Sequence, residues 1–298
     1  MKTAAKEKSF LDEDSVSYDK AKAVIIPFGL EASVTYGGGT SKGPQAMIAA
    51  SPEIERFDEQ LWCEPFKQIG IATLEEPKIS SDIPKELDNL AKTVRNVLDD
   101  GKFPFTFGGE HSITAGTIRP FAEKYDDLVI LHFDAHADLR DGYMGEHYSH
   151  ASALRRCLDD DAVKNRGEHI ELVSCGIRNI SAEEIPFLEA NRNRIHIYWG
   201  KDKKDWDVKK IVSHLQGRNV YLTFDVDGFD SSAMPATGTP EPGGVFWPDV
   251  VEIITQAVKV CNIVGADVNE LAPIKGWHAC DFLAAKLVYK ILSLVFVK

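Results

Sequence analysis

Short apolar segments rich in β-branched and aromatic residues recur along this chain, and longer segments with helical periodicity separate most of them. Continuous apolar runs of this length are typical of strands that are buried on both faces. Their alternation with helices predicts a parallel sheet covered by helices on both sides. The expected strands are Ala23–Phe28, Phe103–Phe107, Leu128–Phe133, Ile170–Cys175, Ile195–Tyr198, Val220–Phe224 and Ile263–Val268.

Helical periodicity is clearest where one side of a segment gathers the apolar residues. In Lys85–Leu98 they recur three or four positions apart, and Gly101 follows as a stop signal. We expect further helices at Asp207–Leu215 and Pro248–Val260, and a buried, amphipathic C-terminal helix at Phe282–Val297 capped by Asp281.

No linker, repeat or low-complexity stretch interrupts this rhythm. We therefore expect residues 1–298 to form a single α/β domain, with residues 1–20 as a flexible or peripheral N-terminal segment. The chain has 298 residues, of which 44% are hydrophobic, and this suffices for a large buried core.

The charge balance limits the partners. There are 34 basic and 46 acidic residues, a formal net charge of −12. A nucleic-acid surface needs a basic face, so we expect no nucleic-acid partner. The acidic field suits a small cationic substrate.

The five cysteines are scattered and include no Cys-x-x-Cys pair. This pattern indicates reduced thiols in the cytoplasm and argues against zinc ligation by cysteine. The charged N-terminus has no apolar core of a signal peptide, and the C-terminal apolar segment is short for a bilayer. We expect a cytoplasmic protein with no membrane partner.

Three polar segments follow expected strands, where open α/β sheets form their sites. They read Phe-Gly-Gly-Glu-His111-Ser, Phe-Asp134-Ala-His136-Ala-Asp138 and Phe-Asp225-Val-Asp227. In extended backbone, alternate side chains point the same way, so these residues face one point. Four clustered, buried carboxylates repel one another unless cations neutralise them. Two divalent ions would balance the charge, and a donor set of oxygen with some imidazole suits manganese, although other divalent metals remain open.

These three segments resemble, in order, the metal-binding signatures of the ureohydrolase family, which comprises arginase, agmatinase and their relatives. The resemblance extends from about Val24 to the C-terminus. It implies one α/β domain with a central parallel sheet of about eight strands, assembled into trimers or hexamers.

The resemblance also implies a binuclear manganese centre. One ion would be held by His111, Asp134, Asp138 and Asp225, and the other by Asp134, His136, Asp225 and Asp227, with Asp134 and Asp225 bridging. A hydroxide shared by the ions would attack the guanidinium carbon and release urea and an amine. Asp138 would hold that hydroxide and pass its proton to the leaving nitrogen.

Two further segments carry expected catalytic residues. Within Gly-Glu-His147-Tyr-Ser-His150 a loop histidine could shuttle protons; likeness to agmatinases favours His150, with His147 as the alternative. Glu270 follows another strand and resembles the glutamate that binds the guanidinium group through paired hydrogen bonds. Glu110 is expected to support the neighbouring ligand, and His132 to be a core histidine with satisfied hydrogen bonds.

The substrate depends on the loop after the second signature, where the asparagine and serine or threonine pattern of arginase is missing. This favours agmatine, cleaved to putrescine and urea. Arg140 could instead bind an acidic tail, as in guanidinobutyrate or formiminoglutamate, or form a surface ion pair; arginine, guanidinopropionate and guanidine also stay open. Thr223, Ser231 and Ala236 depart from the usual residues of the family without removing a ligand.

Two other classes of function compete with this reading. A deacetylase on a related fold would hold a single zinc ion and hydrolyse an amide without releasing urea. A non-catalytic binding protein would be expected to have lost ligands, and none of the six is missing.

Overall fold

The computed structural model describes residues 1–159, 163 and 167–297. Within them, eight parallel strands form one sheet in the order β2-β1-β3-β8-β7-β4-β5-β6. The strands are β1 Ala23–Phe28, β2 Ile71–Thr73, β3 Phe103–Gly108, β4 Leu128–Phe133, β5 Glu171–Cys175, β6 Ile195–Tyr198, β7 Asn219–Asp225 and β8 Asn262–Asn269. The expected parallel α/β fold is confirmed, and the short edge strand β2 adds to the seven expected strands.

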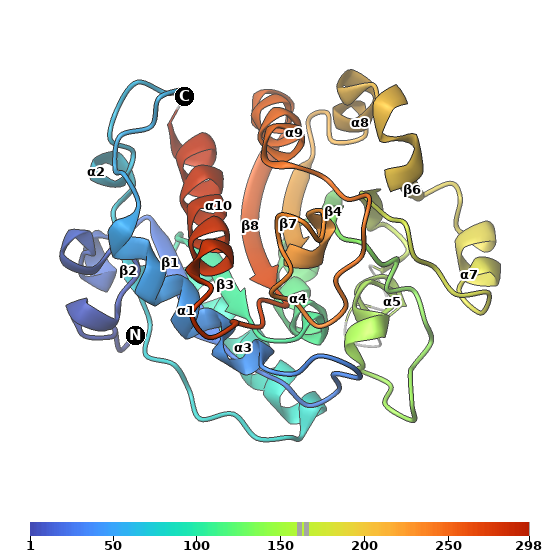
Figure 1. Cartoon of the computed structure of the whole chain (residues 1–298), viewed down its shortest axis with the longest axis horizontal. Coiled ribbons are helices and arrows are strands. Elements are labelled where there is room, and N and C mark those ends of the chain that lie inside the picture. The colour runs from blue at the N-terminus through green and yellow to red at the C-terminus, as the bar shows by residue number, and fades with distance from the viewer. Residues whose placement is uncertain (160–162, 164–166, 298) are drawn as a thin grey trace.

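Helices cover both faces of the sheet (Figure 1). One layer holds α1 (Gly43–Ala50), α8 (Val208–Ser213), α9 (Trp247–Val260) and α10 (His278–Phe296), which contact one another in the order α1, α10, α9, α8. The other holds α3 (Ile83–Asp99), α4 (Thr114–Lys124) and α5 (Ala153–Asp159), which also contact in sequence. The short helices α2 (Phe66–Ile69) and α7 (Ile185–Ala190) lie in connections before β2 and β6.

The two layers explain why the strands are apolar throughout. Successive side chains of a strand point to opposite faces. In β1, Ile25 joins the core under α1 and α10, whereas Val24 and Ile26 join the core under α3 and α4. All six residues of β1 are buried. Only a sheet covered on both sides buries such a run, which is the physical basis of the sequence expectation.

The C-terminal helix corrects one expectation. Helix α10 begins at His278, so Asp281 lies in its first turn and does not cap it; Trp277 takes the cap position. The buried residues Cys280 and Ala284 extend the apolar side of the helix toward its N-terminus. This extra turn starts the helix before the aspartate that the sequence suggests as its cap.

The N-terminal residues lie along the β2 edge of the sheet (Figure 1). The Ala4 N–H donates to Thr73 O, and the Val16 N–H donates to Ile71 O. Phe10 and Leu11 are buried, with Phe10 stacked edge-on against Phe107 at 5.5 Å. Backbone pairing and two apolar anchors therefore attach this segment to the sheet.

In the part of the chain that the structure describes, no helix combines the length and the apolarity needed to cross a bilayer.

Candidate active site

Four neighbouring strands at the centre of the sheet, β3, β8, β7 and β4, end at the site. His111 follows β3, Asp134 follows β4, Asp225 ends β7 and Glu270 follows β8. Because all strands are parallel, these ends meet at one edge of the sheet. The chain order changes between these strands, which leaves a crevice where the loops diverge. The fold therefore brings together segments that are far apart in the sequence.

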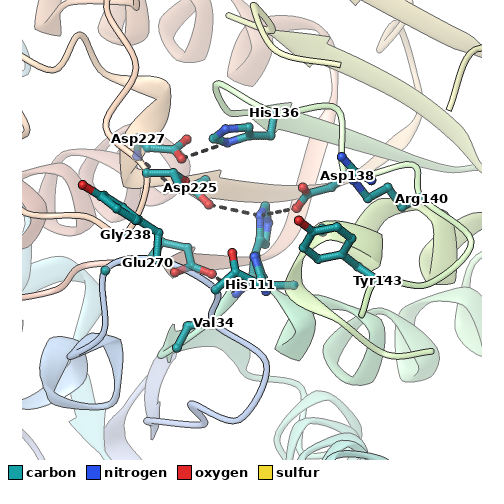
Figure 2. Close-up of a pocket in the computed structure, with 16 residues that line it drawn as sticks. Val34, His111, His136, Asp138, Arg140, Tyr143, Asp225, Asp227, Gly238 and Glu270 are labelled. Carbon is teal, nitrogen blue, oxygen red and sulfur yellow. Dashed lines mark hydrogen bonds and ion pairs between the residues drawn. The ribbon is translucent and has the colours of Figure 1, made fainter. Parts of the chain in front are cut away.

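His111 lies at the centre of the cluster (Figure 2). Its Nδ1 is 3.1 Å from Asp134 Oδ2, 3.2 Å from Asp138 Oδ2 and 3.4 Å from Asp225 Oδ2. The ring is held from behind, because Nε2 lies 2.8 Å from Thr223 Oγ1. Thr223, one of the departures from the family pattern, thus keeps a hydroxyl in contact with this histidine.

A second imidazole approaches the same carboxylates from the other side. His136 Nδ1 is 3.0 Å from Asp227 Oδ2 and 3.6 Å from Asp134 Oδ1. Asp134 therefore faces His111 with one oxygen and His136 with the other. Asp134, His136 and Asp227 form one group able to hold a cation, and Asp134 also belongs to a group with His111 and His132.

His132 is a core histidine with both ring nitrogens engaged, as expected. Nδ1 lies 3.0 Å from Ser174 Oγ and Nε2 lies 2.8 Å from Asp134 Oδ2. Its side chain is fully buried, and it does not line the cavity described below. We therefore interpret it as a residue that orients the Asp134 carboxylate, a role that the sequence pattern does not reveal.

The electrostatics of the cluster fit divalent cations. Asp134, Asp138, Asp225 and Asp227 are all buried. Burial, with repulsion from Asp227 and Asp134, raises the pKa of Asp225 well above its usual range. His111 Nδ1 is buried and has no hydrogen-bond partner among the described residues, although three carboxylates face it. A buried imidazole nitrogen grouped with carboxylate oxygens, in a cavity whose lining includes no cysteine, makes a donor set for an oxygen-preferring or borderline divalent ion.

Two site residues have strained backbones. Asp138 has φ of 53° and Glu270 has φ of 67°, both in the left-handed region that favours glycine. Strain at a non-glycine residue persists when the surrounding structure enforces it, and it concentrates at functional sites. Backbone hydrogen bonds do so here: Glu270 N–H donates to Gly109 O at 2.7 Å, and Asp138 O accepts from Arg155 N–H at 3.0 Å.

Glu270 faces the cluster of aspartates and histidines and is hydrogen-bonded to it. Its Oε1 accepts a hydrogen bond from the His111 backbone N–H at 2.7 Å. The side chain lines a cavity of about 190 Å³, a size that suits a small substrate. The cavity is also lined by His111, His136, Asp138, Asp225, Asp227, Arg140, Tyr143, His150, Tyr36 and Thr239.

The loop after Asp138 separates the two candidate shuttle histidines. His150 lines the cavity, whereas His147 does not. The Nδ1 of His147 instead lies 2.8 Å from a guanidinium nitrogen of Arg156. Arg140 lines the mouth, forms an ion pair with Glu183 and lies 4.5 Å from the centre of the Tyr143 ring. The structure thus brings His150 and Arg140 to the cavity and leaves His147 outside it.

Two glycine-containing loops close the cavity mouth. Gly37 lies so close to Gly238 that a Cβ on Gly37 would stand 2.8 Å from the Gly238 carbonyl oxygen. Tyr36 and Thr239 of these loops line the cavity. The contact explains why a side chain is excluded at this point.

The Glu110 carboxylate is hydrogen-bonded to the loop at residues 32–33 and to Ser112. It accepts hydrogen bonds from the Ala32 and Ser33 N–H groups and the Ser33 and Ser112 hydroxyls. Glu110 therefore fixes the loop that carries Val34 to Gly37 along the cavity wall. Ser33 gave no signal in the sequence, since its neighbours match no motif.

A model of the arginase family matches residues 21–293 of this chain. An N(1)-aminopropylagmatine ureohydrolase of Synechocystis sp. is 31% identical over an alignment of 300 positions, which covers 96% of this chain and 93% of that protein. An agmatinase of Bacillus anthracis is 34% identical over 268 residues, 87% of this chain and 86% of that protein.

The fold has a close match among solved structures as well. The agmatine ureohydrolase of Thermoplasma volcanium superposes with a TM-score of 0.84 at 30% identity, covering 97% of this chain and 94% of that one. These matches span the sheet and every segment that reaches the cavity. This protein therefore belongs to the arginase family and is an agmatinase-like ureohydrolase.

Proposed function

We propose that this protein is a binuclear manganese hydrolase that cleaves agmatine to putrescine and urea. The observation that carries the proposal is the position of Asp134 between two imidazoles, with its two oxygens facing His111 and His136. A buried carboxylate in this position suits a bridge between two cations. Glu270 lines the cavity that His111 and His136 also line (Figure 2).

The proposed ligand sets use the six histidines and aspartates of the three signature segments. One ion would be held by His111, Asp134, Asp138 and Asp225, and the other by Asp134, His136, Asp225 and Asp227. When bound, two close divalent ions would supply Lewis acidity and lower the pKa of a bound water molecule to near neutrality. Manganese is our choice because carboxylate oxygens dominate the set and no sulfur is present among the cavity residues.

The side chains of the chain itself divide the remaining work. Glu270 binds and orients the planar guanidinium through paired, charge-assisted hydrogen bonds. Asp138, whose left-handed backbone turns its carboxylate toward His111, is placed to hold a proton during attack and release it to the leaving nitrogen. His150 exchanges protons with solvent at the cavity mouth. The small, polar cavity limits the water around the reacting carbon.

The environment of Arg140 supports a substrate without an acidic tail. Its ion pair with Glu183 and its stacking on Tyr143 already use its charge and its flat face. A carboxylate tail would have to displace Glu183 to bind there. This favours agmatine over guanidinobutyrate or formiminoglutamate as the substrate. Arg140 then lines the cavity without binding the substrate through its charge.

The second candidate substrate is N1-aminopropylagmatine, which extends agmatine by a cationic arm. It is favoured by the Synechocystis relative of that name, which matches over nearly the whole chain. A urea-release screen over agmatine, aminopropylagmatine, arginine and guanidinobutyrate separates the candidates by kcat/KM. The proposal requires agmatine to be the best of the four, and a higher kcat/KM for any other would replace it.

We also infer, from the family, a homo-trimer or homo-hexamer in the cytoplasm. Sedimentation velocity of the purified protein tests the assembly. A monomer that still releases urea would refute the oligomer and leave the chemistry intact.

A further inference from the structure

We propose that Ser33 and Glu110 are positioning residues that fix the tautomer of His150, with the proton on Nδ1 and with Nε2 free to exchange protons in the cavity. The inference rests on the proposed function, in which His150 shuttles protons. Ser33 follows β1 and Glu110 follows β3, so the fold brings together two residues that are 77 positions apart in the chain.

The Ser33 hydroxyl makes three contacts. Its Oγ lies 2.8 Å from Glu110 Oε1, 2.9 Å from the His150 backbone nitrogen and 3.2 Å from His150 Nδ1. A serine hydroxyl has one proton to donate and two lone pairs to accept with. The backbone N–H of His150 can only donate, so it occupies one lone pair.

The Glu110 carboxylate decides where the hydroxyl proton goes. It is fully buried and receives the Ala32 N–H at 2.7 Å, the Ser33 N–H at 2.6 Å and the Ser112 hydroxyl at 2.6 Å. The backbone N–H groups can only donate, and both serine hydroxyls also point their hydrogens at this carboxylate. The Ser33 hydroxyl therefore donates to Glu110, and its second lone pair is left for His150 Nδ1.

The tautomer of His150 follows from this count. Nδ1 must carry a hydrogen to make the remaining contact with Ser33, so Nε2 of the neutral ring has the free lone pair. His150 lines the cavity, and with Nδ1 turned to Ser33 the nitrogen available to substrate and solvent is Nε2. In a shuttle step Nε2 takes up one proton and later releases it, while the hydrogen on Nδ1 stays in place.

Ser149 is a weaker partner for the same nitrogen. Its Oγ lies 3.5 Å from His150 Nδ1 and already accepts the Ala151 N–H at 3.3 Å. Among the residues that the structure describes, loss of Ser33 therefore leaves the Nδ1 hydrogen with only this weaker partner, and the ring becomes free to adopt the other tautomer or to rotate.

Three variants test the proposal kinetically. Ser33→Ala removes the acceptor, Ser33→Thr keeps a hydroxyl, and Ser112→Ala is a matched control that deletes a hydroxyl from the same Glu110 oxygen without touching His150. We expect Ser33→Ala to lower kcat by about tenfold, which is part of the ~10²–10⁴-fold that general acid–base catalysis contributes, with KM changed less than about threefold. Ser33→Thr should restore kcat. The pH profile should change in Ser33→Ala and persist in Ser112→Ala.

A readout independent of activity is the ¹⁵N spectrum of histidine-labelled, full-length protein loaded with a diamagnetic divalent ion. The His150 signal is identified by its loss in His150→Asn. The Nδ1-protonated form in the native protein, lost in Ser33→Ala, supports the proposal. An Nε2-protonated ring in the native protein overturns it, as does a Ser33→Ala variant with native kcat, or one whose only defect is in KM. A native protein that releases no urea would instead refute the proposed function, and the spectrum would still decide the tautomer.

Discussion

The Glu270 carboxylate accepts a hydrogen bond from the backbone N–H of His111 at 2.7 Å, so the proposed substrate anchor and a proposed metal ligand are joined directly. Burial raises the pKa of Glu270 well above its usual range, against that hydrogen bond. Such a carboxyl gains most from a cationic partner. A bound guanidinium group offers that partner, with two parallel N–H donors.

Glu270→Gln tests this anchor. The amide oxygen can still accept from His111, but the charge is lost. We expect kcat/KM for agmatine to fall roughly ten- to hundredfold, because hydrogen bonds to charged groups contribute about 1.5–3 kcal/mol. Metal content measured by plasma mass spectrometry should stay at the native level. A variant with native kcat/KM would remove Glu270 from substrate binding.

Asp134→Ala tests the bridging assignment. Loss of a carboxylate that faces both imidazoles should remove both ions and all urea release, whereas Asp227→Ala should mainly weaken the site that contains His136. Equilibrium dialysis against Mn²⁺ measures both stoichiometries. Retained activity in Asp134→Ala, or an equal loss of metal in the two variants, would contradict the assignment.

Much of the fold follows from local pattern. The seven longer strands are apolar because helices cover both faces, and that signal is readable without homologues. Strand β2 does not show this signal, because a three-residue edge strand has too few positions to form a recognisable apolar run. The sequence also places the start of α10 too late, because Asp281, which resembles a capping residue, lies inside the first turn of the helix.

The site divides in the same way. The aspartates and histidines of the signatures are recognisable because alternate residues at strand ends converge. The contacts of Ser33 with His150 and of Thr223 with His111 join residues 117 and 112 positions apart, and no local pattern encodes them. The choice between His147 and His150 likewise depends on how one loop folds around Arg156.

Asp230 gives a pH-dependent prediction. Hydrogen bonds from Ser232 and the Gly243 and Gly244 N–H groups outweigh burial and lower its pKa to about 2. The unfolded value is about 3.9, so the stabilisation is complete above that pH and is lost as the pH falls toward 2. Asp230→Asn should therefore lower Tm at pH 7, with a gap from the native protein that narrows below pH 4. A constant gap across this range would contradict the assignment.

A buried ion pair gives a stability prediction away from the site. Lys290 Nζ lies 2.9 and 2.8 Å from the two oxygens of Asp58, and both residues are buried. Lys290→Met leaves an unpaired buried carboxylate and should cost about 3–5 kcal/mol in urea denaturation. The double variant Asp58→Asn/Lys290→Met removes both charges and should recover part of this loss. A double variant less stable than Lys290→Met would show that the carboxylate, not the pair, carries the stability.

The central claim is a two-ion centre that produces urea. It is tested most directly by adding Mn²⁺ stepwise to metal-free protein and measuring bound manganese and urea released from agmatine in the same samples. The account predicts that urea release requires, and saturates at, two manganese ions per chain. Full activity at one ion per chain, or no urea from agmatine or any other guanidino compound at two, would contradict it.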